Sequence, residues 1–135
     1  MLHCLLHAKS AAVKSSQRPL DDRITAGLET WIDEKGFCRT DENLAEVAER
    51  IGVSPDALSY YCSNIIGEHF GTFRKRLRLE EAKSLIKEDP QRTLISVAAS
   101  VGILDRGNFR RQFYELYGYS PSEYRQKCLK RAWRK

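Results

Sequence analysis

The stretch "LISVAASVGILDRGNFRRQF" spans residues 94–113 and repeats, in outline, the earlier stretch "LAEVAERIGVSPDALSYYC" at residues 44–62. Both begin with leucine, valine, alanine and then isoleucine or valine at spacings of three and four residues, followed at once by glycine. This spacing places the apolar residues on one helix face, and glycine readily adopts the positive φ that ends a helix. Each stretch therefore predicts a short helix and a tight turn.

A second helix is predicted after each turn. Ser54 and Asp105 occupy corresponding positions, and both residue types cap a helix by accepting a backbone N–H bond. The apolar residues one turn apart in these helices are Leu58 and Cys62 in the first copy and Phe109 and Phe113 in the second. A helix, a short turn and a capped second helix form a helix-turn-helix unit. The alternative is a generic pair of helical hairpins in a bundle.

The residues between the copies, 72–89, predict one long helix. Leu79, Ala82 and Ile86 have helical spacing, and no glycine or proline interrupts the segment before Pro90. Such a helix is about 27 Å long, close to the roughly 34 Å between successive major grooves on one face of B-DNA. Two units held at that separation could enter successive grooves.

Two further helices are expected outside the copies. An amphipathic helix is expected from Asp21 to Lys35, ended by Gly36, and the capping box "SPSE" at 120–123 is expected to start a last helix toward Trp133. The sequence thus predicts an all-α fold of about seven helices, with two helix-turn-helix subdomains joined by a long linker helix.

The expected organisation is a flexible N-terminal segment or linker at 1–20, a first helix-turn-helix subdomain at 21–71, a linker helix at 72–89, a second helix-turn-helix subdomain at 90–126 and a basic C-terminal tail at 127–135. The chain is 41% hydrophobic and 30% charged, as is typical of globular proteins. No apolar run approaches the roughly 20 residues of a membrane span. We expect a cytoplasmic chain, or the cytoplasmic output domain of a longer membrane sensor.

The net charge of +5 is unevenly distributed along the sequence. Residues 21–70 contain 4 basic and 11 acidic side chains, whereas residues 106–135 contain 9 basic and 2 acidic side chains. A concentration of positive charge favours a polyanionic partner. The C-terminal end is therefore the electrostatic candidate for nucleic-acid binding.

Four segments, "LAEVAERIGVSPDALS", "GEHFGTFRKRLRLEEAKSLI", "VAASVGILDRGNFRRQF" and "YGYSPSEYR", resemble the C-terminal DNA-binding domain of AraC/XylS-family transcription regulators. The resemblance covers about residues 24–125. It implies two units that each offer their second helix to the major groove of double-stranded DNA. The chain departs from the family pattern at Tyr60 and Cys62, where an arginine or lysine and then a phenylalanine are usual, and at Ile103, which replaces an aromatic residue.

The resemblance and the residue types predict which side chains of the second unit contact DNA: Arg106, Gly107, Asn108, Arg110 and Arg111. Arginine can bind guanine O6 and N7 bidentately, and asparagine can do the same for adenine. Gly107 would allow the backbone a close approach. The alternative is that the arginines only cover a solvated helix face.

The corresponding residues of the first unit are Pro55, Asp56, Ser59 and Tyr60. This helix has no cation, and its acidic residue would repel phosphate, so we expect it to add little affinity. Arg92 and Thr93 begin the second unit's first helix, where helix N-termini commonly meet phosphate. The basic run from Arg74 to Arg76 is expected to be either a solvated face or a phosphate contact.

Other chemistry has little support in the sequence. His3, Cys4 and His7 have near-metal spacing but no fourth ligand, and the four cysteines are scattered as expected for reduced thiols. We expect no enzyme activity, no cofactor, no metal and no small-molecule site. The sequence predicts a sequence-specific, double-stranded DNA-binding transcription regulator, with RNA polymerase or a fused sensor domain as a further partner. The alternative is a helical protein-interaction module with weak or lost DNA binding.

Overall fold

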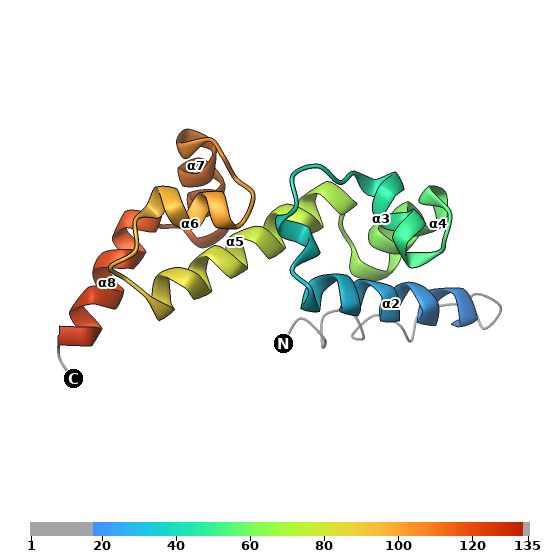
Figure 1. Ribbon diagram of the computed structural model, residues 1–135, viewed down its shortest axis with the longest axis horizontal. Helices are drawn as coiled ribbons and strands as arrows, with labels where there is room; N and C mark the ends of the chain where they lie inside the picture. Colours follow the sequence, from blue (N-terminus) through green and yellow to red (C-terminus); the bar gives the residue numbers. More distant parts are fainter. Residues whose placement is uncertain (1–17, 134–135) are drawn as a thin grey trace. The chain divides into compact units, whose positions relative to one another are not determined.

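The computed structural model describes residues 18–133, which contain seven α-helices and no strand (Figure 1). The prediction of an all-α fold is confirmed. The chain forms two compact units that divide between Arg74 and Lys75. The division falls within one continuous helix, which is labelled α5 and runs from Phe70 to Glu88.

The first unit contains α2 (Arg18–Asp33), the 3-10 helix η3 (Gly36–Cys38), α3 (Leu44–Ile51), α4 (Pro55–Tyr61), the π-helical turn η4 (Cys62–Ile66) and the start of α5. Helix α2 contacts both α3 and α4, and α3 contacts α4. Apolar side chains from all three helices are buried between them, among them Leu28, Val47 and Leu58. Burial of these side chains from separate helices holds the unit together.

The predicted bounds of the first helix were wrong at both ends. Helix α2 begins at Arg18 rather than Asp21, and it ends at Asp33. Lys35, not Gly36, adopts the left-handed conformation, with φ of 58°. Gly36 has a different role, because a Cβ atom at this position would lie 2.3 Å from Cδ1 of Trp31. The glycine thus allows the backbone to pack directly against the indole ring.

The predicted turn and cap of the first copy are present. Gly52 follows α3 with φ of 90°, and its N–H donates to the carbonyl of Ala48 at 2.9 Å. The Ser54 hydroxyl then accepts the N–H of Ala57 at 3.1 Å and caps α4. The backbone therefore reverses between α3 and α4 as expected for a helix-turn-helix unit.

The end of α4 departs from regular α-helix. The Cys62 carbonyl accepts the N–H groups of Gly67 at 2.8 Å and Glu68 at 3.1 Å. The bond from Gly67 spans five residues, as in a π-helix, and belongs to the π-helical turn η4. The second copy has no such turn at its end, where Gly118 donates to Tyr114 at 2.8 Å.

The second unit contains the rest of α5, then α6 (Leu94–Ser100), α7 (Arg106–Tyr117) and α8 (Pro121–Trp133). Helix α7 contacts both α6 and α8. The α5 residues predicted to be apolar contacts, Leu79, Ala82 and Ile86, are buried. Leu116 is 40% exposed and does not extend the buried face of α7.

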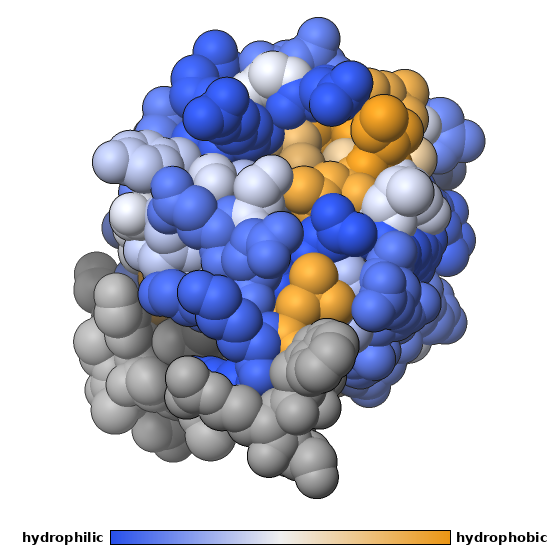
Figure 2. Space-filling model, turned by 90° about the vertical axis from the view of Figure 1, so that its left-hand side faces the viewer, coloured by the Kyte–Doolittle hydropathy of each residue, from blue (hydrophilic) through white to orange (hydrophobic). Residues whose placement is uncertain are grey.

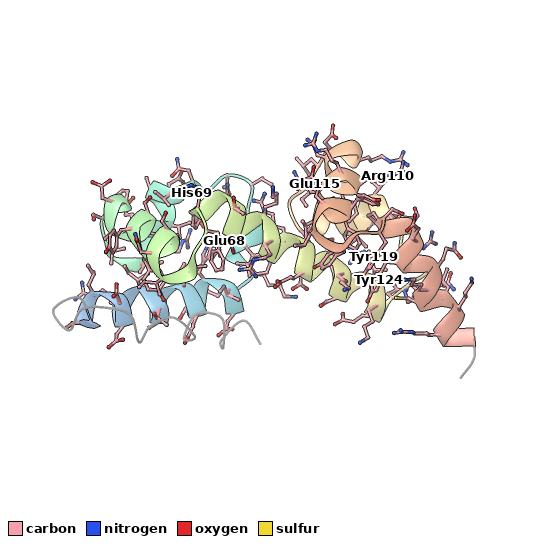
Figure 3. All side chains as sticks on the ribbon, turned by 180° about the vertical axis from the view of Figure 1, so that it is seen from behind. Glu68, His69, Arg110, Glu115, Tyr119 and Tyr124 are labelled. Atoms are coloured by element: carbon pink, nitrogen blue, oxygen red, sulfur yellow. The ribbon has the colours of Figure 1, made fainter. Side chains whose placement is uncertain are left out.

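A cation lies against three tyrosines in the second unit. The Lys83 ammonium lies 4.3 Å from the ring centre of Tyr117, 5.5 Å from that of Tyr119 and 5.2 Å from that of Tyr124. Cations are attracted to the negative face of an aromatic ring. Lys83 thus links α5 to the end of α7 and the start of α8; Figure 3 labels Tyr119 and Tyr124 beside these helices.

A buried carboxylate links several parts of the first unit. Glu42 is only 7% exposed, and its carboxylate accepts Trp31 Nε1 at 3.2 Å and Arg50 Nε at 2.9 Å. The backbone carbonyl of Glu42 accepts the Arg74 guanidinium at 2.5 Å. Burial alone would raise the pKa of Glu42. The hydrogen bonds from Arg50 and Trp31 and the positive charges of Arg50 and Arg39 hold this pKa below its ordinary value.

Two arginines of the basic run at the start of α5 form internal contacts. The Arg74 guanidinium, besides its bond to Glu42, lies 5.3 Å from the ring centre of Phe70. Arg76 pairs with Glu80 at 3.0 Å. Arg74 is therefore held by contacts within the first unit.

We expect Glu42→Gln to lower the free energy of unfolding by about 1–3 kcal/mol, because it removes a buried charge-assisted acceptor. Urea unfolding at neutral pH measures this loss, with the exposed Glu49→Gln as control. Because the folded-state pKa is lowered, the stabilisation is present above the ordinary carboxyl pKa of 4.5 and is lost as pH falls through the folded-state value. The difference between wild type and variant should therefore shrink on acidification. A difference that stays constant would contradict this role.

We expect Lys83→Gln to lower the free energy of unfolding by about 0.5–2 kcal/mol, because glutamine has no charge to place over the three rings. The matched control is Lys87→Gln, an exposed lysine one turn further along α5, which should change stability by less than about 0.5 kcal/mol. Far-ultraviolet circular dichroism during urea unfolding measures both. If both variants lost the same free energy of unfolding, the contacts between Lys83 and the three tyrosines would not stabilise the fold.

Candidate nucleic-acid interface

Helix α7 presents two different faces. The Asp105 carboxylate caps its N-terminus by accepting the N–H of Asn108 at 2.8 Å. Phe109 and Phe113 lie one turn apart and are buried, as predicted from their spacing. The side chains of Arg106 and Arg110 are exposed. The buried phenylalanines therefore leave the arginine-rich face of α7 to solvent.

Two of the three α7 arginines remain available for a ligand. Neither Arg106 nor Arg110 forms an ion pair with a residue in the described range 18–133. Figure 3 shows Arg110 pointing away from the body of its helix. An exposed guanidinium without a carboxylate partner can bind an anion or a base edge without first breaking an ion pair.

The third arginine is already engaged within its own helix. Arg111 donates to the side-chain oxygen of Asn108 at 2.9 Å and lies 3.9 Å from the carboxylate of Glu115. Both contacts are exposed, and contacts of this kind contribute little stability. To bind adenine bidentately, Asn108 would have to release Arg111. Gly107 is exposed on the same helix, and a Cβ there would meet only the Asp105 carboxylate, at 3.2 Å.

The corresponding face of α4 has no positive charge. Its predicted contact residues, Pro55, Asp56, Ser59 and Tyr60, are all exposed, with Tyr60 51% exposed. Leu58 lies on the opposite, buried side. The same scaffold position thus offers an acid, a hydroxyl and a phenol in the first unit but guanidinium groups in the second.

The start of α6 is occupied by internal hydrogen bonds. The Thr93 hydroxyl caps the helix by accepting the N–H of Ser96 at 3.2 Å. Arg92 folds along α6, donating to the Ser96 hydroxyl at 2.8 Å and to the Ser100 hydroxyl. A phosphate contact by Arg92 would have to compete with these bonds.

The charge difference between the two units is large. From Lys75 onward the chain has 15 basic and 7 acidic residues, a net charge of +8, whereas the residues up to Arg74 have 8 basic and 11 acidic residues, a net charge of −3. Long-range attraction of a polyanion therefore comes from the second unit.

One cation near this face was not predicted. Arg125 of α8 donates through Nε to the backbone carbonyl of Pro90 at 2.7 Å, and its side chain lines a hollow with Arg106 and Arg110. The residues that form this hollow are far apart in sequence, so periodicity could not have revealed it. The only local sign was the arginine in "SPSEYR".

Other kinds of site are absent from the part of the chain that the structure describes. No three side chains of His, Cys, Asp or Glu lie close enough there to hold a metal ion. His3, Cys4 and His7 lie outside the described residues. Within that described part, no helix is long and apolar enough to cross a membrane. Cys38, Cys62 and Cys128 are free thiols, and burial raises the pKa of Cys62 to about 12.

Residues 47–127 match the family model described as a helix-turn-helix domain. The chain is 29% identical over 124 residues to the arabinose operon regulatory protein of Escherichia coli, covering 92% of this chain and 41% of that protein. It is 32% identical over 82 residues to the HTH-type transcriptional regulator Rv1931c of Mycobacterium tuberculosis, covering 61% of this chain and 31% of that protein. The chain thus spans less than half the length of these relatives.

Two solved structures are similar to this chain in fold. The C-terminal domain of AraT, a response regulator from Geobacillus stearothermophilus, is similar with a TM-score of 0.68 and 28% identity, over 78% of this chain and 84% of that one. The C-terminal domain of the two-component response regulator yesN from Fusobacterium nucleatum is similar with a TM-score of 0.62 and 25% identity, over 72% of this chain and 92% of that one. The family model, the relatives and the fold agree, and the chain belongs to the AraC-type helix-turn-helix family of transcription regulators.

Proposed function

We propose that this chain binds double-stranded DNA sequence-specifically and regulates transcription. The observation that supports this best is the exposed, unpaired pair Arg106 and Arg110 on the capped helix α7. An α-helix fits the major groove, where guanine presents two acceptors to a guanidinium. Helix α7 is the reading helix of the second unit in this proposal.

The second unit dominates affinity in this proposal. Its net charge of +8 attracts the phosphate backbone, whereas the exposed face of α4 contributes Asp56 and no cation. Helix α4 adds sequence preference through Asp56, Ser59 or Tyr60, since aspartate can accept from cytosine N4. The two reading helices enter successive major grooves, with α5 as the linker helix. RNA polymerase or a fused sensor domain is the proposed further partner.

A protein-interaction module is the second candidate. Apolar side chains on the surface of the second unit favour it: Leu104 is 76% exposed and Tyr114 is 56% exposed. The exposed face of α4, which carries Asp56 and no cation, is compatible with either function. Binding to a mixed-sequence duplex at low salt separates the two candidates, because only the DNA-binding protein loses affinity steeply as salt rises.

We expect Arg106→Ala and Arg110→Ala each to weaken binding to a selected duplex by about 1–3 kcal/mol, roughly 5- to 150-fold, if each arginine binds a guanine. Fluorescence anisotropy with a duplex selected from a random pool measures the change. The matched control is Arg23→Ala, an exposed arginine on α2, which should retain wild-type affinity. Unchanged affinity in a variant that combines Arg106→Ala with Arg110→Ala would refute the dominant role of the second unit.

We expect the α4 variant Asp56→Asn to keep or slightly raise overall DNA affinity, because it removes a charge that repels phosphate. If Asp56 reads a base, the variant should also relax sequence preference at one position. Repeating the random-pool selection with the variant measures both effects. A loss of affinity as large as that of Arg110→Ala would contradict the minor role proposed for α4.

A further inference from the structure

A hollow of about 680 Å³ lies within the second unit, between α6, α7 and the first turns of α8. Its walls come from three segments, 93–98, 106–110 and 120–125. Cavities of roughly 300–1,000 Å³ are typical of sites for small organic ligands. The chemistry of the walls identifies the class of ligand.

Apolar residues make up part of the lining of the hollow: Leu94, Ile95, Ala98, Phe109 and Pro121. Ile95 is 55% exposed although it is large and apolar. Figure 2, which looks onto the side of the molecule that bears this unit, shows apolar surface bordered by charged and polar side chains. A ligand with an apolar body would remove this surface from water.

Three cations also line the hollow, namely Arg106, Arg110 and Arg125, and no acidic residue does. The bond from Arg125 Nε to the Pro90 carbonyl holds this guanidinium in place, so less rotamer entropy is lost on binding. Arginine binds carboxylates bidentately and also stacks on aromatic faces. The cations therefore select an anion, and they suit a flat one.

Three hydroxyl residues, Thr93, Ser120 and Ser122, also line the hollow, and two of them cap helices. The Ser120 side chain is 8% exposed and accepts the N–H of Glu123 at 3.1 Å, while Thr93 accepts the N–H of Ser96. A hydroxyl that accepts one bond still has its own O–H to donate. A carboxylate has only acceptors, so it matches both the hydroxyls and the arginines.

We propose that this hollow binds an aromatic carboxylate, with the carboxylate toward the arginines and the ring on the apolar side chains. A backbone phosphate of DNA could use the same arginines, but it would leave Ile95 and its apolar neighbours uncovered. Arg106 and Arg110 are also the proposed DNA contacts, so the bound carboxylate competes with the duplex. This competition rests on the proposed function, whereas the ligand site itself does not.

Titration of the full chain with naphthoate, followed by the shifts of backbone amides in NMR spectra, tests the site. We expect saturable shifts in segments 93–98, 106–110 and 120–125. The neutral analogue naphthamide and inorganic phosphate at equal ionic strength should not reproduce them. Ile95→Ser should weaken naphthoate binding roughly five- to tenfold, because about half of this side chain is available for burial. The matched control is Leu20→Ser on α2, which should bind as wild type.

Several outcomes would overturn the ligand site: equal binding of naphthamide, equal shifts with phosphate, or full affinity in Ile95→Ser. Displacement of a fluorescent duplex by naphthoate tests the competition separately. A chain that binds duplex but not naphthoate refutes the ligand site alone. A chain that binds naphthoate in the hollow but no duplex at low salt refutes the DNA proposal and supports the ligand site.

Discussion

Burial of Phe109 and Phe113 determines which face of α7 meets solvent. Their ring centres are 5.9 Å apart, and Phe113 also lies 4.7 Å from the ring of Tyr117. Truncating a buried phenylalanine to alanine typically costs about 3–5 kcal/mol, so rotating α7 to expose this pair would be strongly unfavourable. The burial of the phenylalanines therefore keeps Arg106 and Arg110 on the solvent-exposed face of α7, although neither arginine forms an ion pair with a described residue.

The first copy uses the same arrangement with smaller anchors. Leu58 and Cys62 are fully buried at the positions of the two phenylalanines. Helix α4 is followed by a π-helical turn that begins at Cys62. The residue that is smaller than its counterpart Phe113 is therefore also the residue where the backbone changes. Tyr61 compensates in part, because its buried hydroxyl forms a hydrogen bond with Thr25 of α2. Helix α4 is thus anchored by a different set of contacts, and its exposed face has no positive charge.

Features that depend on neighbouring residues could be predicted from the sequence. The caps at Ser54 and Asp105 and the left-handed Gly52 follow from local hydrogen bonding and glycine's freedom at positive φ. Gly36 was misread because its constraint is the Trp31 ring rather than its own φ. The hydrogen bond of Arg74 was not predicted, because its acceptor, the Glu42 carbonyl, is 32 residues away in sequence.

In the candidate site, too, local features were predictable from the sequence and long-range contacts were not. The exposed face of α7 was predictable from the spacing of its phenylalanines, whereas the hollow was not, because its three segments meet only in the folded unit.

The net charge of the second unit does not show which of its cations are available to a ligand. Several cations of the second unit are engaged in internal contacts, namely Arg76, Lys83, Arg92 and Arg125. All 15 basic residues contribute to the long-range field that attracts a polyanion. On α7, within the described residues, only Arg106 and Arg110 have a guanidinium without an internal ion pair or hydrogen bond. Under the proposed function, these two side chains are the ones free to contact base edges. In the proposed function, long-range attraction and base contacts therefore use different subsets of the same positive charge.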